Sequence, residues 1–346
     1  MNNNHYCIIM AGGMGRRLWP YSRKALPKQF IDLFGTGQTL LQQTFDRYKA
    51  IVPKQNIYIT TYKDYKHLVL ELLPEIDESQ LIVEDEIRNT APSIAYASHV
   101  INRINPNATI VVAPTDHLIL KEDAFQEAIR KGLDFASEND KLVTLGIKPN
   151  RPETGYGYIQ IDEEREGDFY KVKTFIEKPE KEFAEIFIKS NEFFWNSGIF
   201  VWKAKTILNA FHCMMPDICP QIECETPDFS ACPNISIDYS IMEKATNVYV
   251  QLCDFGWADV GTWESLYEAL PKDRDENVII NSNTLMYNSK DNLISIPEGH
   301  LAVVQGLEGY LIISKGNTLL ICKKDDQNAI RKFINDAEIK FGEQFS

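Results

Sequence analysis

The first part of the chain alternates between short apolar runs and stretches whose apolar residues recur at helical spacing. Apolar runs of this kind predict buried strands, and a spacing such as that in residues 39–48 predicts an amphipathic helix. Strands and helices in alternation predict a parallel, doubly wound sheet that binds ligands at the carboxyl ends of its strands. The predicted strands are residues 6–10, 57–61, 81–83, 109–113, 142–145 and 193–201, and a further strand is predicted to end at residues 175–179.

The pattern changes after residues 271–276. Short strand-like segments then follow one another, separated by Asn, Gly and Ser turns, and a helix is predicted from Gln327. This pattern predicts a small all-β unit closed by a helix. We therefore expect one domain over residues 1–277 and a second over 278–346. The strand-like segments are 285–287, 293–296, 301–304, 310–313 and 319–322.

Composition narrows the classes of ligand. The chain has 346 residues, of which 44% are hydrophobic and 25% charged, as in ordinary globular proteins. Its 36 Lys and Arg against 49 Asp and Glu give a net charge of −13. Nonspecific nucleic-acid binding needs a broad basic face, so we expect no nucleic-acid partner. An anionic ligand must instead be held by local positive groups.

The sequence also predicts a compartment. It contains no apolar stretch of the ~18–20 residues that cross a bilayer, and its first residues lack the features of a secretory signal. Seven scattered cysteines, an odd number, favour reduced thiols, so we expect a cytoplasmic protein with no membrane partner. Four cysteines cluster without a Cys-x-x-Cys pair, and small buried residues are favoured over a zinc site there. They are Cys213, Cys219, Cys224 and Cys232.

A glycine loop, Ala11-Gly12-Gly13-Met14-Gly15, follows the first predicted strand. Glycines let backbone N–H groups approach an anion closely, and Arg16, Arg17 and Lys28 add full positive charge. The loop thus indicates a phosphate-binding site. Its spacing fits neither the dinucleotide fingerprint nor the P-loop, so a tight turn with solvated arginines remains the alternative.

Two isolated aspartates lie among apolar residues. Asp116 comes just after the strand predicted over 109–113, and Asp259 lies between aromatic and apolar residues before a helix. A carboxylate beside a triphosphate would repel it unless a divalent cation bridges the two. We therefore expect both aspartates to bind a metal ion. A helix cap or a turn is the alternative for Asp116.

Three later segments carry polar groups suited to a sugar phosphate. Gly155 and Tyr156 belong to a Gly-aromatic segment that indicates close backbone approach to a ligand, or else a bulged edge strand. Glu177 could accept hydrogen bonds from hydroxyl groups while Lys178 meets a phosphate, although such pairs are common on surfaces. Asn196 lies within a strongly apolar strand, where only a ligand or a buried network justifies a polar side chain.

Eight segments, in this order, resemble the sugar-nucleotide pyrophosphorylases, and most closely the mannose-1-phosphate guanylyltransferases. The match extends along nearly the whole chain. The segments are 11–20, 27–30, 88–92, 114–117, 153–159, 175–179, 195–200 and 257–261.

The resemblance implies a Rossmann-like, GT-A-like α/β fold with a doubly wound, mixed, mainly parallel sheet. It also implies a small C-terminal β-helix-like domain that often serves in dimer contacts, so we expect a homodimer. In this family the segment with Asn89, Thr90 and Ala91 lies by the guanine base and the strand with Asn196 lies by the sugar. Residues 84–86 are acidic where a proline-containing turn is expected, which leaves the guanine contact open. Some bacterial relatives carry a fused phosphomannose isomerase domain, and the end of this chain at residue 346 leads us to expect a single activity.

The reaction implied is GTP plus α-D-mannose 1-phosphate giving GDP-mannose and pyrophosphate, by in-line attack on the α-phosphate. The attacking phosphate has a second pKa of about 6 and is largely ionised at neutral pH, so no general base is needed. Positioning and charge neutralisation remain for the protein to supply. The alternatives are another base or sugar 1-phosphate, or a non-catalytic paralogue that binds sugar nucleotides, which has no need of both aspartates.

Each expected residue then has a role in this reaction. Arg16 and Lys28 would stabilise the triphosphate and the leaving pyrophosphate, and Lys178 the attacking phosphate, while Arg17 has no assigned role. The expected catalytic residues are Arg16, Lys28, Asp116, Lys178 and Asp259, with Mg²⁺ on Asp116 and Asp259. The expected nucleotide-binding residues are Ala11, Gly12, Gly13, Met14, Gly15, Arg16, Lys28, Asn89, Thr90, Ala91 and Asp116. The expected sugar-phosphate-binding residues are Gly155, Tyr156, Glu177, Lys178 and Asn196.

Overall fold

The computed structural model describes residues 1–224 and 226–345. Contacts along the chain divide it into two compact units. The domain boundary expected near residue 278 falls inside the last stretch of unit 2 and stays a prediction. Unit 1 comprises Met1–Gly12, Thr44–Thr115 and Ile119–Trp257, and unit 2 comprises Gly13–Gln43, Asp116–Leu118 and Ala258–Ser346.

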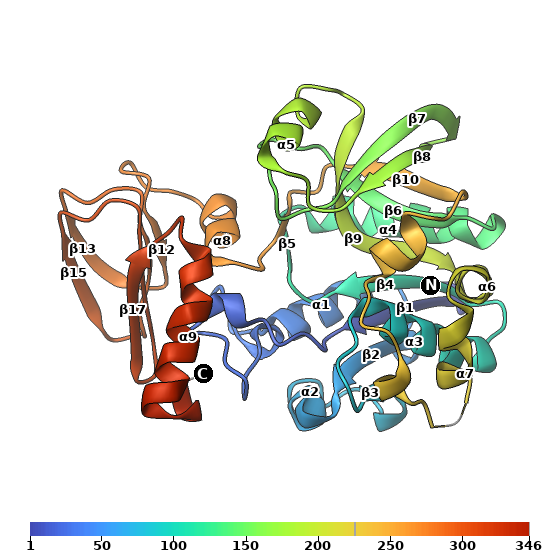
Figure 1. The fold of residues 1–346 in the computed structure, drawn as a ribbon, viewed down its shortest axis with the longest axis horizontal. Coiled ribbons are helices and arrows are strands. Elements are labelled where there is room, and N and C mark those ends of the chain that lie inside the picture. The colour runs from blue at the N-terminus through green and yellow to red at the C-terminus, as the bar shows by residue number, and fades with distance from the viewer. Residues whose placement is uncertain (225, 346) are drawn as a thin grey trace. The chain divides into compact units, whose positions relative to one another are not determined.

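Within the described ranges, unit 1 is built on a sheet of nine strands in the order β3-β2-β1-β4-β9-β6-β10-β8-β7 (Figure 1). Strands β1 to β4, β6 and β10 run in one direction, and β9 lies antiparallel between β4 and β6. The predicted mixed, mainly parallel sheet is confirmed. The strands are β1 (His5–Met10), β2 (Ile57–Tyr62), β3 (Leu81–Glu84), β4 (Thr109–Pro114), β6 (Leu142–Ile147), β7 (Tyr158–Glu166), β8 (Phe169–Ile176), β9 (Phe193–Lys203) and β10 (Val248–Cys253).

Helices cover both faces of this sheet. Tyr6 and Ile8 of β1 point into a core that includes buried residues of α3 and α6. Because side chains alternate along a strand, Cys7 points to the opposite face, where α1 and α4 meet through the edge-on rings of Tyr48 and Phe125, 5.7 Å apart. No helix in the described part of the chain is long and apolar enough to cross a membrane. The helices that begin before Asp259 are α1 (Leu40–Lys49), α2 (Lys66–Leu72), α3 (Thr90–Ile104), α4 (Glu122–Glu138), α5 (Lys181–Phe187), α6 (Ala204–Met214) and α7 (Cys219–Ile222).

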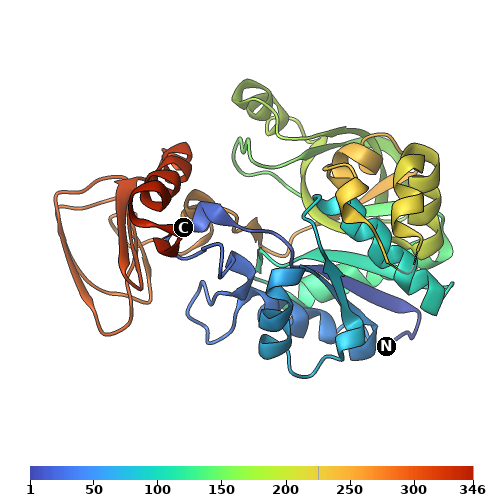
Figure 2. The ribbon, with the colours of Figure 1, turned by 60° about the horizontal axis from the view of Figure 1, so that its bottom comes forward.

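Unit 2 contains the predicted β-helix-like coil. Its chain passes back and forth between two sheets, so that β12, β14 and β16 pair in parallel in one sheet and β13 and β15 in the other. Ile294 and Ile312 of the first sheet pack against Val304 of the second, while the outer face of the first sheet packs on α9 (Figure 2). The elements are β12 (Val278–Ile280), β13 (Asn283–Tyr287), β14 (Leu293–Ser295), β15 (Leu301–Gln305), β16 (Tyr310–Lys315), β17 (Thr318–Lys323), α8 (Trp263–Ala269) and α9 (Gln327–Phe341). Two further short strands, β5 (His117–Ile119) and β11 (Trp257–Asp259), lie where the chain passes between the two units.

The hydrophobic pattern locates many of these elements, but it predicts no strand over β10 and no helix over α5 or α6. Helix α3 begins at Thr90, where Asn89 adopts φ 67° and its side chain accepts a hydrogen bond from the Thr90 N–H. The pattern does not predict strand β12, since three residues are too few to give a periodic signal.

Glu84, at the end of β3, is a buried acid with one close partner. The residue is 4% exposed, and Ser93 Oγ donates a hydrogen bond to its Oε1. Burial raises the pKa of Glu84 to about 7, against the lowering effect of the Ser93 hydroxyl. The folded state therefore keeps the proton that the unfolded chain releases near its ordinary pKa of 4.5.

This shift makes stability depend on pH in a defined direction. Between pH 4.5 and about pH 7 the folded state binds more protons than the unfolded state, so the free energy of unfolding falls as pH rises through this window. We expect Glu84→Gln to stabilise the protein by on the order of 2 kcal/mol at pH 8 and by much less at pH 5. Chemical denaturation at both pH values measures this difference. The exposed Glu86→Gln is the control, and an equal gain for both variants would contradict the assignment.

Candidate active site

The predicted binding residues of unit 1 lie at the carboxyl edge of its sheet. Ala11 follows β1 and Asn89 follows β3, while Asn196, on the antiparallel β9, pairs with Gly146 near the end of β6. This is the edge at which doubly wound sheets bind ligands.

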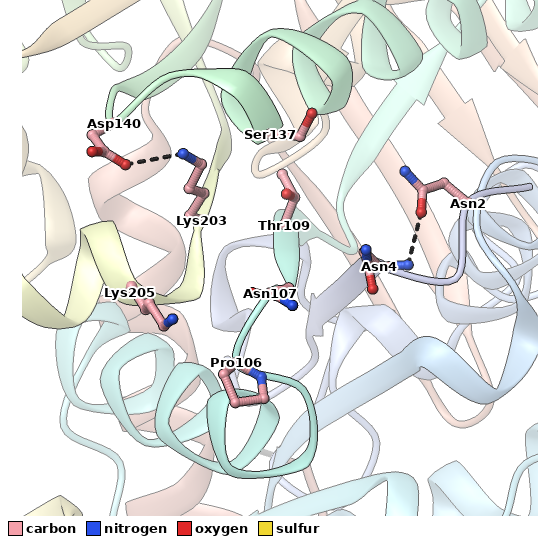
Figure 3. A pocket seen from close by; sticks show the side chains of 9 residues that line it. All are labelled: Asn2, Asn4, Pro106, Asn107, Thr109, Ser137, Asp140, Lys203 and Lys205. Atoms are coloured by element: carbon pink, nitrogen blue, oxygen red, sulfur yellow. Dashed lines mark hydrogen bonds and ion pairs between the residues drawn. The ribbon is translucent and has the colours of Figure 1, made fainter.

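A polar pocket of about 460 Å³ lies at the other edge (Figure 3). It includes Asn4, just before β1, and Thr109, the first residue of β4. Lys203 points to Asp140 across one side, with Nζ and Oδ1 3.0 Å apart. The pocket is therefore separate from the predicted binding residues of unit 1.

The glycine loop is held by hydrogen bonds to its backbone. In unit 1, Ala11 donates its N–H to Thr60 O at 2.8 Å. In unit 2, Gln29 Nε2 donates to Gly13 O at 2.8 Å, and Gly15 has φ 56°, which favours glycine. A Cβ at Gly15 would lie 2.6 Å from Lys28 Cγ, so the glycine lets this lysine lie against the loop.

Asp116 and Asp259 are brought together in unit 2. Lys28 Nζ donates to Asp116 Oδ2, and Val260 donates its N–H to Asp116 O at 2.9 Å, which joins the two aspartate segments through the backbone. Burial alone would raise the pKa of Asp116, but Lys28 and His117 outweigh it and hold this pKa well below its ordinary value. Burial and then the Asp116 carboxylate raise the pKa of Asp259.

Arg17 also lies beside this pair, a placement that the sequence did not indicate. A Cβ at Gly261 would be 3.1 Å from both Arg17 Nη2 and Asp259 Oδ1. The Arg17 guanidinium favours the charged form of Asp259, although less than burial and Asp116 oppose it. Because Arg16 and Arg17 are adjacent in the sequence, no sequence signal indicates which of the two lies beside the aspartates.

The two adjacent carboxylates suit a divalent cation. Mg²⁺ is a hard cation that proteins hold through one or two carboxylates together with substrate phosphates. A cation between Asp116 and Asp259 would also remove the repulsion that raises the pKa of Asp259. The donor set therefore fits the predicted metal, whose binding stays a prediction.

The predicted base-binding segment is tied to a later loop. Ile237 donates its N–H to Thr90 Oγ1 at 2.9 Å, and Ala91 donates its N–H to Ile235 O at 3.2 Å. Arg88 Nη2 donates to Ser230 O at 3.0 Å. The start of α3 is thus fixed to residues of the 230–237 segment.

The Gly-aromatic segment packs inward at Tyr156. This residue is 7% exposed, and its ring lies 5.3 Å from that of Trp195 and 5.0 Å from that of Trp257. The Arg151 guanidinium lies 5.1 Å from the Trp195 ring. Gly155 donates its N–H to Glu153 Oε1 at 2.9 Å. The ring of Tyr156 is thus enclosed largely by other aromatic side chains, and the sugar contact expected at this segment stays a prediction.

Glu177, Lys178 and Asn196 come together in unit 1. Lys178 Nζ donates to Glu177 Oε1, and the Glu177 side chain is only 10% exposed whereas that of Lys178 is 60% exposed. Gly157 leaves room for the Glu177 carboxylate, because a Cβ at this glycine would lie 2.8 Å from Glu177 Oε2. Asn196 donates its N–H to Gly157 O at 2.8 Å, so the same glycine joins the two segments.

Asp238 is a second residue that sequence reasoning missed. Asn196 Nδ2 donates to Asp238 Oδ1 at 3.0 Å. In the sequence, Asp238 is an isolated acid in a Ser-Ile-Asp-Tyr segment before a short apolar stretch. This isolation resembles that of Asp116 and Asp259 and is the signal that could have identified it.

The clustered cysteines include two buried small residues. Cys219 and Cys232 belong to the hydrophobic core of unit 1. One mixed group of potential metal ligands within the described ranges joins Cys219 to His212 and Glu223. His212 Nε2 lies 2.9 Å from Glu223 Oε1, and this contact accounts for their closeness.

Comparison with known proteins identifies the family of the chain. The nucleotidyl transferase family model matches residues 6–276. The mannose-1-phosphate guanylyltransferase of Klebsiella pneumoniae is 36% identical over 346 residues, covering 94% of this chain and 72% of the relative, and that of Escherichia coli matches to the same extent. The Thermus thermophilus crystal structure described as mannose-1-phosphate geranyltransferase is 31% identical with a TM-score of 0.88, covering 97% of this chain and 99% of that one. The chain therefore belongs to the mannose-1-phosphate guanylyltransferase family of nucleotidyl transferases.

Proposed function

We propose that this enzyme transfers GMP from GTP to α-D-mannose 1-phosphate, forming GDP-mannose and pyrophosphate. The observation that carries the proposal is the charged group of unit 2, in which Lys28 and Arg17 accompany the adjacent carboxylates of Asp116 and Asp259. Relatives that match nearly the whole of this chain are named for the same activity.

The chemistry requires neutralisation of charge rather than a base. The phosphate of the sugar is already largely ionised at neutral pH and attacks the α-phosphorus in line as pyrophosphate leaves. Both substrates are anions, so the barrier falls when fixed positive groups act on the charge that develops. None of the six histidines is needed for proton transfer.

Each charged residue then has a proposed task. Arg16, Arg17 and Lys28 would bind the triphosphate and stabilise the leaving pyrophosphate. Lys178 would bind the phosphate of mannose 1-phosphate. Asp116 and Asp259 would hold Mg²⁺, which when bound supplies further charge neutralisation at the reacting phosphates.

Product identification tests the activity. Incubation with GTP, mannose 1-phosphate and Mg²⁺ should give GDP-mannose and an equal amount of pyrophosphate, measured by mass spectrometry and a pyrophosphate-release assay. A panel of four nucleotides and several hexose 1-phosphates tests the alternative substrates. Faster turnover of another nucleotide or sugar phosphate would replace the proposed pair of substrates.

Asp259 should be essential for turnover but not for folding. We expect Asp259→Asn to lower kcat by at least about 100-fold, because it removes one carboxylate of the metal pair, while the melting temperature stays the same or rises as the repulsion with Asp116 is lost. Calorimetric titration with Mg²⁺ and nucleotide should show weaker metal binding. The exposed Asp254→Asn is the matched control. Wild-type rates for Asp259→Asn at the same Mg²⁺ concentration would remove Asp259 from the metal site.

We also propose that the enzyme is a homodimer formed through the outer face of β13 and β15. Burial alternates along both strands, and Leu285 pairs with Val303 on the exposed side. Leu301 is 59% exposed and Val303 61%, and Tyr287 of the same face is 52% exposed. Adjacent exposed apolar side chains mark interaction surfaces, and the family resemblance favours a second copy of the chain as the partner.

Charge placed on this face should separate the subunits. We expect the double variant Leu301→Lys and Val303→Lys to sediment as a monomer under conditions where the wild type is a dimer, because like charges would be desolvated in the interface. Ile186→Lys, at an exposed apolar residue of α5, is the control and should leave the dimer intact. A double variant that stays dimeric would assign the interface to another surface.

A cytoplasmic location is proposed as well. The odd number of cysteines and the burial of Cys7 inside β1 suit a compartment that keeps thiols reduced.

A further inference from the structure

The carboxamide of Asn196 is fixed from three sides. The Gly198 N–H, which can only donate, lies 3.1 Å from Asn196 Oδ1, and the Thr144 hydroxyl lies 3.0 Å from the same oxygen. Because the oxygen must face the Gly198 N–H, the amide nitrogen Nδ2 must face the other way. Asn196 is 9% exposed and Thr144 is fully buried, so this orientation is set within the protein.

In this orientation the amide nitrogen of Asn196 faces the Asp238 carboxylate. Its Oδ1 lies 3.0 Å from Asn196 Nδ2. An amide nitrogen has two hydrogens, so one remains for a ligand, and a carboxylate has about four acceptor directions, so Asp238 can accept further hydrogen bonds. With its oxygen and one N–H engaged, Asn196 can offer a ligand a single donor in a fixed direction.

The segment that carries Asp238 also holds the predicted base-binding residues. Ile237, the preceding residue, donates its N–H to Thr90 Oγ1, and Ile235 O accepts the N–H of Ala91. Asp238 begins the short π-helical turn Asp238–Met242. The position of this carboxylate is therefore set by the start of α3 and not by a free loop.

The surroundings of Asp238 are rich in acceptors. Glu177 interacts unfavourably with Asp238 and with Glu243, while Lys178 provides the compensating positive charge at Asp238. Burial, and then Glu177, raise the pKa of Asp238 to about 6. Lys244 supplies positive charge at Glu243. Carboxylates interspersed with lysines suit a ligand that carries hydroxyl donors and an anionic group, as a hexose phosphate does.

We propose that Asp238 is a positioning residue that fixes the Asn196 carboxamide, and that this pair discriminates between hexose 1-phosphates by the orientation of one ring hydroxyl. The inference rests on the proposed function for the identity of the reaction. To the proposed function the inference adds the residue Asp238 and a mechanism for discriminating between hexose 1-phosphates. The remaining N–H of Asn196 Nδ2 has a fixed direction, so it favours a sugar whose hydroxyl oxygen can accept a hydrogen bond from that direction. A sugar with the opposite configuration at this carbon leaves the N–H unpaired.

Two variants separate positioning from charge. Asp238→Ala removes the acceptor, and we expect the KM for the preferred hexose 1-phosphate to rise about tenfold, with the KM for GTP within about twofold. The preference over glucose or galactose 1-phosphate, as a ratio of kcat/KM, should fall by a similar factor. Asp238→Asn can still accept from Asn196 Nδ2 through its own amide oxygen, so its sugar preference should stay within about threefold of the wild type.

The assay is kcat/KM for mannose, glucose and galactose 1-phosphate with GTP and Mg²⁺, with thermal unfolding of every variant. Asp254→Ala, at an exposed aspartate that pairs with Lys121, is the matched control. If Asp238→Ala does not fold, Asp238→Ser takes its place, since its shorter side chain cannot reach the same amide.

The outcomes distinguish this inference from the proposed function. An unchanged sugar preference in Asp238→Ala would overturn the inference, and so would equal losses in Asp238→Ala and Asp238→Asn, which would indicate an effect of charge. A wild type that prefers a sugar phosphate other than mannose 1-phosphate would overturn the proposed substrate alone, because the same variants still test how that preference is set.

Discussion

The proximity of two like charges is the constraint on which the candidate active site depends. Two carboxylates held close together repel each other, and the repulsion is stronger inside a protein than in water. Asp116 is compensated by Lys28, whereas the pKa of Asp259 is raised by burial and by Asp116. A fold optimised only for stability would separate such groups, so their retention favours a function that uses the site's attraction for cations.

The backbone around the pair maintains this arrangement. The hydrogen bond from the Val260 N–H to Asp116 O holds the two segments together, and Gly15 leaves room for Lys28 against the loop. The side chains of Leu18, Trp19 and Trp263 anchor the same segments in the core of unit 2. Charged groups are thus placed by apolar packing and by backbone contacts that do not themselves bind substrate.

The sequence predicts those features that have a local signal, either a periodic apolar pattern or a charged residue isolated among apolar ones. Strand β1, with its continuous apolar run, and the glycine loop after it are local signals, and Asp116 and Asp259 stand out because they interrupt apolar surroundings. Asp238 is isolated in the same way, but its partner Asn196 lies far along the chain, and so does Gly261, beside which Arg17 lies; no local pattern encodes either pairing. The short β12 was missed because tertiary pairing with β14, and not its own sequence, defines it.

The central claim is that the charged group of unit 2 catalyses transfer of a nucleotidyl group and does not merely bind a sugar nucleotide. The reaction in reverse tests it most directly. With GDP-mannose, Mg²⁺ and radiolabelled pyrophosphate, the account predicts label in GTP and equimolar release of mannose 1-phosphate. Tight binding of GDP-mannose without incorporation of label into GTP would contradict it.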